Sequence, residues 1–161
     1  MEASAQVVVQ AAPTAAETRW LLDLARDTPF VAGVVGWTDF DADDAPDAIA
    51  ALAREPMLVG LRPMVQDIAD ADWLARASLA PAFEAMIAND LAFDALVLPR
   101  HLIRLATVLD RHPALRVVVD HGAKARRAVR VLVLRREVPR GLDDRRLELD
   151  ADDLGPGGQE R

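Results

Sequence analysis

The chain alternates between short apolar segments and longer segments in which apolar residues recur at helical spacing. The apolar segments are rich in β-branched residues and mostly do not alternate polar with apolar positions. That pattern is typical of strands buried on both faces, as in parallel sheets covered by helices. The predicted strands are residues 6–10, 30–37, 57–61, 91–98 and 116–120.

The segments between these strands carry the start and stop signals of helices. Thr14 and Glu17 fit a capping box, in which both side chains satisfy backbone donors at the start of a helix that runs to about residue 26. The other helix signals are an Asp44 and Pro46 start, apolar faces within 79–87 and 102–109, and a stop at His112-Pro113.

A strand followed by a helix therefore repeats along the chain, with strand starts roughly 24 to 34 residues apart, as in right-handed βαβ units. Two architectures use this unit, the (β/α)₈ barrel and the open doubly wound sheet. The first predicted strand is followed by Ala11-Ala12-Pro13-Thr14, which is not a glycine-rich phosphate loop. This disfavours a nucleotide-binding open sheet.

The five predicted strands are too few for a closed barrel, which needs eight strands and roughly 200 residues or more. The charge balance also changes near residue 122. Residues 1–121 contain 9 Arg and 18 acidic residues, whereas residues 122–161 contain 10 basic and 8 acidic residues. We therefore expect a partial barrel domain over 1–124 and a divergent, Arg-rich, disordered tail over 125–161, in which 129–134 can form a sixth short strand.

Composition narrows the class of protein further. The 161 residues are 52% apolar and include no cysteine, so a sizeable core is expected, without disulfides or thiolate chemistry. The net charge of −7 disfavours nucleic acid and anionic membranes as partners. There is no basic, apolar leader and no apolar run of about 18 residues. We expect a cytoplasmic protein.

Polar residues stand where the predicted strands end, which is where parallel α/β folds place reactive groups. His121 is the strongest candidate, because an imidazole at that edge can bind a metal, polarise a carbonyl or move a proton. The Arg62 guanidinium can bind a substrate carboxylate or lactone oxygen, and Gln66 can donate to the same oxygen. Gln10 and Trp37 are expected to line the same cavity.

Each candidate also has a structural alternative. His121 can simply bond a loop, Arg62 can pair with a loop acid such as Asp67, Gln66 can cap a loop and Trp37 can be packing. His101 is expected to be a surface or capping residue, His112 a structural one, and the acidic run 39–47 a solvated loop leading to a helix start.

The ordered set of segments resembles the amidohydrolase-related (amidohydrolase 2) family, and within it the predicted TIM-barrel metal-dependent hydrolases that include sugar lactonases. The resemblance covers about residues 6–124. It rests on segments 8–12, 30–37, 58–62, 66–68, 72–74, 93–97, 99–102 and 111–121. It implies a (β/α)₈ barrel that hydrolyses a cyclic ester, with the five visible strands as the second to sixth of the barrel.

The resemblance also implies roles for two residues. His121 matches the histidine that ends the sixth strand, where it binds a divalent metal such as zinc or helps to polarise the carbonyl. Arg62 matches a fourth-strand arginine that contacts the substrate. The family's first-strand His-x-His and eighth-strand Asp have no counterpart here, so we expect an incomplete version of the enzyme. The Arg-rich change after Lys124 suggests a shifted reading frame.

Two functional hypotheses therefore remain open. The chain is either part of a lactonase-like hydrolase that acts on a small molecule, or a non-catalytic protein, as a truncated remnant or an α/β interaction module. In both cases a sheet with unclosed edges predicts self-association.

Overall fold

One sheet runs through the computed structural model, which describes residues 5–124 and 133–134. Its strands pair in the order of the chain, and β1 to β5 are all parallel while β5 and β6 are antiparallel. The strands are β1 (Gln6–Val9), β2 (Val31–Gly36), β3 (Leu58–Leu61), β4 (Ala92–Ala95), β5 (Val117–Val119) and β6 (Val133–Leu134).

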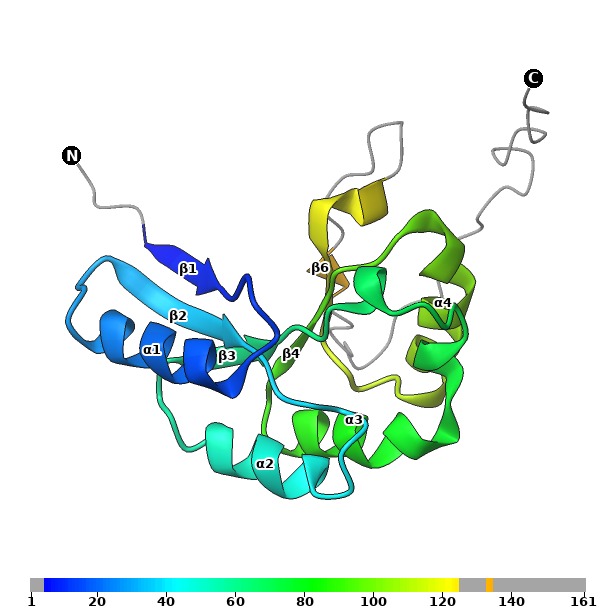
Figure 1. Cartoon of the computed structure of the whole chain (residues 1–161), viewed down its shortest axis with the longest axis horizontal. Helices are drawn as coiled ribbons and strands as arrows, with labels where there is room; N and C mark the ends of the chain where they lie inside the picture. Colours follow the sequence, from blue (N-terminus) through cyan, green and yellow to red (C-terminus); the bar gives the residue numbers. More distant parts are fainter. Residues whose placement is uncertain (1–4, 125–132, 135–161) are drawn as a thin grey trace, which may run out of the picture.

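Four α-helices of the described part connect these strands and lie on the outer side of the curled sheet (Figure 1). They are α1 (Ala15–Arg26), α2 (Ala45–Leu52), α3 (Ala80–Ala88) and α4 (Leu102–Arg111). Short 3₁₀ turns complete the connections: η1 (Val65–Asp67), η2 (Trp73–Ala75), η3 (Ala77–Leu79), η4 (Pro99–His101) and η5 (Asp120–Lys124). None of the helices in the described ranges is long and apolar enough to cross a membrane.

The sequential strand order separates the two architectures that the βα repeat left open. A doubly wound sheet reverses its strand order at a switch point, whereas a barrel adds each strand beside the previous one. All five predicted strands and the helix signals are therefore confirmed, and their arrangement is that of consecutive barrel units. Most of the predicted tail lies outside the described residues, so its disorder and the boundary at 124 stay predictions.

The core lies between the sheet and the helices, and three phenylalanines join its layers. Phe40 follows β2, Phe83 lies on α3 and Phe93 on β4, and their ring centroids are 5.3 to 6.3 Å apart. All three are buried. Phe83 meets both Phe40 and Phe93 edge to face, a contact that stabilises a pair beyond the apolar area it buries. Phe40 thereby anchors the loop after β2 at the carboxyl edge of the sheet.

The start of α1 is capped much as the sequence predicts. The Thr14 hydroxyl accepts a hydrogen bond from the Glu17 backbone N–H at 3.2 Å. The Glu17 carboxylate accepts from the backbone N–H groups of Ala11 and Ala12, rather than from that of Thr14 as in a standard capping box. One acidic side chain therefore fixes the loop that leaves β1 as well as the helix that follows it.

Candidate functional site

Gln10 and Arg62 meet at the carboxyl edge of the sheet, where β1 and β3 end. Gln10 is buried, and its Nε2 donates to the Arg62 carbonyl oxygen at 2.9 Å and to the Met64 sulfur at 3.4 Å. The Arg62 backbone N–H donates to the Gly36 carbonyl at 2.8 Å. The backbone around Arg62 is therefore held by residues at the ends of β1 and β2, and its side chain leaves a fixed position.

The Arg62 guanidinium is clamped by two carboxylates from the next two strands. Its Nε and Nη2 donate to the same Oδ2 of Asp94 at 3.0 and 2.7 Å, and Nη2 lies 2.5 Å from Oδ2 of Asp120. Side-chain exposures of 12% for Arg62, 9% for Asp94 and 20% for Asp120 place this group largely out of solvent. The ion pair expected as the alternative for Arg62 thus forms, but with these two residues and not with Asp67.

Asp94 is the most buried acid of this group. Burial raises the pKa of its carboxyl, an effect that the Arg62 charge and hydrogen bonds partly offset. Its Oδ1 is buried and has no hydrogen-bond partner among the described residues. Over the same residues, Nη1 of Arg62 forms no hydrogen bond or ion pair. This leaves Nη1 as the nitrogen of the guanidinium able to donate to another molecule.

His121 follows β5 in a left-handed turn. The φ angles of His121, Gly122 and Ala123 are 49°, 56° and 55°, a region that residues with a Cβ seldom adopt. The His121 backbone N–H donates to Oδ1 of Asp120 at 2.8 Å, and its Nε2 lies 3.4 Å from Oδ2 of the same carboxylate. The side chain is 67% exposed, so the ring is open to solvent.

Asp120 therefore lies between the guanidinium of Arg62 and the imidazole of His121. Three of the five candidate residues predicted from the sequence, Gln10, Arg62 and His121, therefore lie at one edge of the sheet. We call this group the rim cluster, and it consists of Gln10, Arg62, Asp94, Asp120 and His121.

The other two predicted residues lie beside the rim cluster. Gln66 is half-buried in η1, and its Nε2 donates to Oδ2 of Asp67 at 3.4 Å. The backbone N–H and carbonyl of Trp37 bond the Thr18 hydroxyl at 2.8 and 3.1 Å, which fixes the chain where β2 ends. The indole of Trp37 lines a cavity together with Met64, the residue whose sulfur accepts from Gln10, so a cavity shared by Trp37 and Gln10 stays a prediction.

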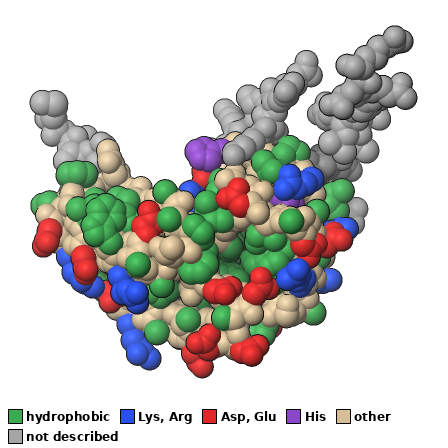
Figure 2. Space-filling model, in the orientation of Figure 1, with side chains coloured by type: hydrophobic (Ala, Val, Ile, Leu, Met, Phe, Trp, Pro, Cys, Tyr) green, Lys and Arg blue, Asp and Glu red, His purple; other side chains and the backbone are tan. Residues whose placement is uncertain are grey.

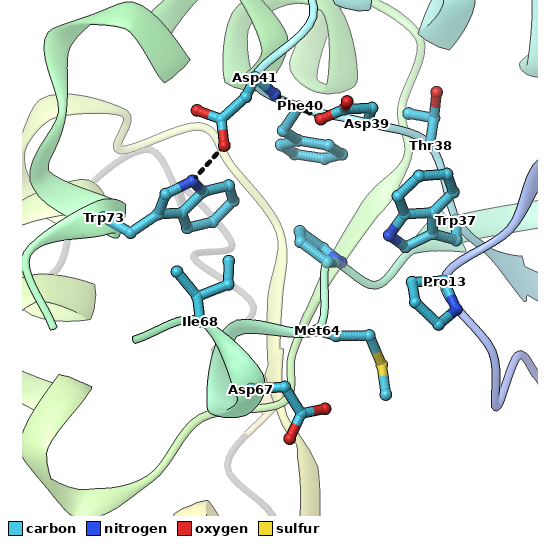
Figure 3. Close-up of a pocket in the computed structure, with 11 residues that line it drawn as sticks. Pro13, Trp37, Thr38, Asp39, Phe40, Asp41, Met64, Asp67, Ile68 and Trp73 are labelled. Carbon is cyan, nitrogen blue, oxygen red and sulfur yellow. Dashed lines mark hydrogen bonds between the residues drawn. The ribbon is translucent and has the colours of Figure 1, made fainter. Parts of the chain in front are cut away.

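This cavity has a volume of about 250 Å³ and opens beside the ends of β1, β2 and β3. Trp37 and Trp73 lie on opposite sides of the cavity (Figure 3). In the space-filling view, apolar side chains line a hollow and acidic side chains surround it (Figure 2). We call it the indole cavity. Its lining residues are Pro13, Trp37, Thr38, Asp39, Phe40, Asp41, Pro63, Met64, Asp67, Ile68 and Trp73.

Sequence reasoning missed several residues of this region. Asp94 carries a signal, because an acid inside an apolar strand needs a cationic partner. The acidic run is not simply solvated, since Asp41 accepts from the Trp73 indole N–H at 2.6 Å and pairs with Arg76 at 3.3 Å. His101 does cap a turn, because its Nδ1 accepts from the Leu98 N–H at 3.1 Å, but the residue is buried and not on the surface.

The described residues do not form a metal shell. None of the His, Asp and Glu side chains in 5–124 gather in a group of three or more that could hold an ion. His121 can supply one ligand, but one oxygen of Asp120 binds Arg62 and the other accepts from the His121 N–H. These residues alone therefore do not fit a resident zinc ion.

Comparisons of the sequence place the chain among hydrolases. The family model described as Amidohydrolase matches residues 2–148. An L-fucono-1,5-lactonase of Burkholderia ambifaria is 58% identical over 118 residues, which are 73% of this chain and 41% of that protein. An L-fucono-1,5-lactonase of Burkholderia multivorans is 36% identical over 121 residues, 74% of this chain and 40% of that protein. The chain thus spans about two fifths of these relatives.

Solved structures agree with the fold. Two crystal structures of an amidohydrolase from Burkholderia multivorans, one with bound HEPES and one with bound zinc, superpose with a TM-score of 0.68 at 36% identity. They match 74% and 75% of this chain and 42% and 43% of theirs. The predicted fold class, a partial (β/α)₈ barrel of five consecutive parallel units, is confirmed.

Proposed function

Because the chain belongs to the amidohydrolase family, we propose that it is part of a hydrolase that opens the cyclic ester of a sugar acid. The names of the two lactonase relatives support this substrate class. Since the chain spans about two fifths of their length, the activity of the whole protein is part of the proposal.

The reaction adds water across the acyl C–O bond of the lactone. Water attacks the carbonyl carbon, the ring C–O bond breaks, and a hydroxyl and a carboxylic acid form, the latter releasing a proton. Such a reaction requires donors for the negative charge that develops on the carbonyl oxygen, and a group that moves protons. Side chains at the carboxyl edge of a barrel are placed for both tasks.

The rim cluster supplies candidates for these roles. Nη1 of Arg62 has no partner among the described residues, and Asp94 and Asp120 fix the other two nitrogens of the guanidinium, so Nη1 can donate to the substrate from a set position. The imidazole of His121 can polarise the carbonyl or move a proton. The observation that carries the proposal is that Asp120 contacts both Arg62 and His121, 58 and 1 residues away in sequence.

A divalent metal, which the resemblance implies and a related structure contains, is part of the proposal only for the whole protein. When bound, such an ion polarises the carbonyl or activates water. Among the described residues no three His, Asp or Glu side chains gather to hold such an ion, so the roles proposed above are those of side chains alone.

The test is hydrolysis of L-fucono-1,5-lactone by the purified 161-residue chain, followed as acid release with a pH indicator. We expect turnover above the spontaneous rate and a loss of about 100-fold or more in H121A, the range for removal of a group that moves protons. H112Q is the matched control, because His112 ends α4 and packs on Phe83, away from the rim cluster. Folded protein without turnover would contradict the proposal.

A second candidate is a non-catalytic α/β protein that retains the barrel segment. The observation that favours it is that no three His, Asp or Glu side chains of the described residues gather in one place, whereas a zinc centre takes three or four protein ligands. It predicts that the folded chain leaves the lactone unhydrolysed and takes up no zinc at equilibrium dialysis. Stoichiometric zinc uptake would exclude this candidate.

A further inference from the structure

We infer that the indole cavity binds the uncharged ring of the lactone and repels the carboxylate that hydrolysis creates. The inference rests on the proposed function, and it assigns to that site a means of telling substrate from product. It uses residues outside the rim cluster, and the family resemblance implies no role for any of them.

The walls of the indole cavity suit a small ring. Trp37 and Trp73 face each other across it, with Phe40 on one side and Met64 and Ile68 on the other (Figure 3). A volume of about 250 Å³ lies just below the range of drug-sized pockets, which fits a single six-membered ring. The faces of indole rings carry negative charge density, and the C–H groups of a saturated ring pack well against them.

The polar groups of the cavity match a ring with hydroxyls. Within the described part of the chain, the indole N–H of Trp37 and the hydroxyl of Thr38 form no hydrogen bond. Both can donate to the ring or carbonyl oxygen of a lactone. Asp39 and Asp67 are exposed acids on the lining and can accept from sugar hydroxyls. An uncharged, polyhydroxylated ring satisfies both kinds of group.

The charge of the cavity opposes the product. Asp39, Asp41 and Asp67 line it, and Arg76 pairs with Asp41 from outside the lining. None of the lining residues is a cation, and Arg100, which donates to the Gln66 carbonyl at 3.2 Å, also lies outside the lining. An entering carboxylate would therefore meet three acids and no cation among the lining residues, which is unfavourable, whereas a neutral lactone would not be repelled.

The two indoles provide the readout for a binding test on the full 161-residue chain. The probes are L-fucose, a neutral ring that cannot be hydrolysed, and L-fuconate, the open-chain acid. We expect L-fucose to quench tryptophan fluorescence and to bind at least 10-fold more tightly than L-fuconate. The quench should be lost in W37F but retained in W20F, because Trp20 is exposed on α1.

The double variant D39N/D67N tests the electrostatic part. Both side chains are exposed, so the fold should survive, and asparagine can still accept hydrogen bonds. We expect its affinity for L-fuconate to rise about 10-fold, and the preference for L-fucose to shrink. A matched D23N/D27N variant on the far end of α1 should leave both affinities unchanged.

The outcomes separate this inference from the proposed function. Equal binding of the two probes, tighter binding of L-fuconate, or no binding of either would overturn the inference, even if the chain hydrolyses the lactone. The inference is supported if the wild type binds L-fucose more tightly than L-fuconate and if D39N/D67N reduces this preference by binding L-fuconate more tightly. This holds even if the chain does not hydrolyse the lactone.

Discussion

At the scale of single residues, the sequence predicts where side chains emerge better than what they contact. Gln10, Arg62 and His121 each stand at the end of an apolar strand, which predicts that they emerge at one edge, and the structure brings them together there. The partner of Arg62 was not predicted correctly. Asp67 is near in sequence, whereas Asp94 and Asp120 become neighbours only because parallel strands align their ends, which local spacing does not encode.

His101 yields a prediction about pH at this scale. Burial, with a smaller contribution from the charge of Arg100, lowers the pKa of this histidine in the folded protein. As the pH falls below about 6.5, the unfolded chain takes up a proton at this position before the folded chain does. The stability that the folded protein gains from keeping His101 neutral is therefore fully present above that pH. It is lost progressively as the pH falls below it.

The variant H101Q separates this effect from others. A glutamine at this turn position can still accept from the Leu98 N–H but does not titrate. Urea unfolding between pH 7 and 5 should therefore show a shallower loss of stability in H101Q than in the wild type. Parallel curves for wild type and H101Q would contradict the assignment.

At the scale of elements, the periodicity of apolar residues predicts every strand and helix of the repeat. A strand buried on both faces reads as a continuous apolar run, whereas a helix buried on one face shows apolar residues at helical spacing. The strands are shorter than predicted at their ends; the segment 91–98, for example, contributes Ala92–Ala95 to the sheet. Residues beyond Ala95 stay apolar and buried without pairing, so composition alone could not mark where the strand stops.

The contact between β3 and β4 gives a prediction at this scale. A Cβ added to Gly60 would lie 2.6 Å from the carbonyl oxygen of Ala92, which is main chain and cannot move without disturbing the sheet. We expect G60A to lower the free energy of unfolding by about 2 kcal/mol, as overpacking does. The control is G33A, where the added atom meets the Val59 side chain, so a smaller loss is expected in urea denaturation. Equal losses would show that the strands can separate at Gly60.

At the scale of the whole molecule, the βα spacing alone does not predict the strand order, because it fits both a barrel and an open doubly wound sheet. The sequential order is expected only if the open sheet is excluded. The indole cavity could not be predicted, because it assembles from three loops whose approach depends on the curl of the sheet. Its Trp73 and Asp41 come from segments that the sequence presents as unrelated, an acidic loop and a turn 32 residues later.

Self-association remains a prediction for the whole molecule. Within the described residues β1 pairs only with β2, and large apolar side chains are exposed nearby: Val7, Trp20, Leu24 and Phe30. Apolar side chains gather over the β1 and α1 end of the surface (Figure 2). An exposed edge strand beside an apolar surface favours association. Sedimentation velocity should show mass rising with concentration, less so in V7K/W20K, with I103K as the control on α4. A concentration-independent monomer would refute it.

The central claim is that Arg62 and His121 act as one site across the end of the sheet. A double-mutant cycle on lactone hydrolysis tests it, with R62K, which retains the charge that Asp94 and Asp120 require, H121A and the combined variant. Residues that act as a unit lose activity non-additively, so the account predicts that the combined variant is little slower than the worse single variant. Fully additive losses, or a single variant with wild-type turnover, would contradict it.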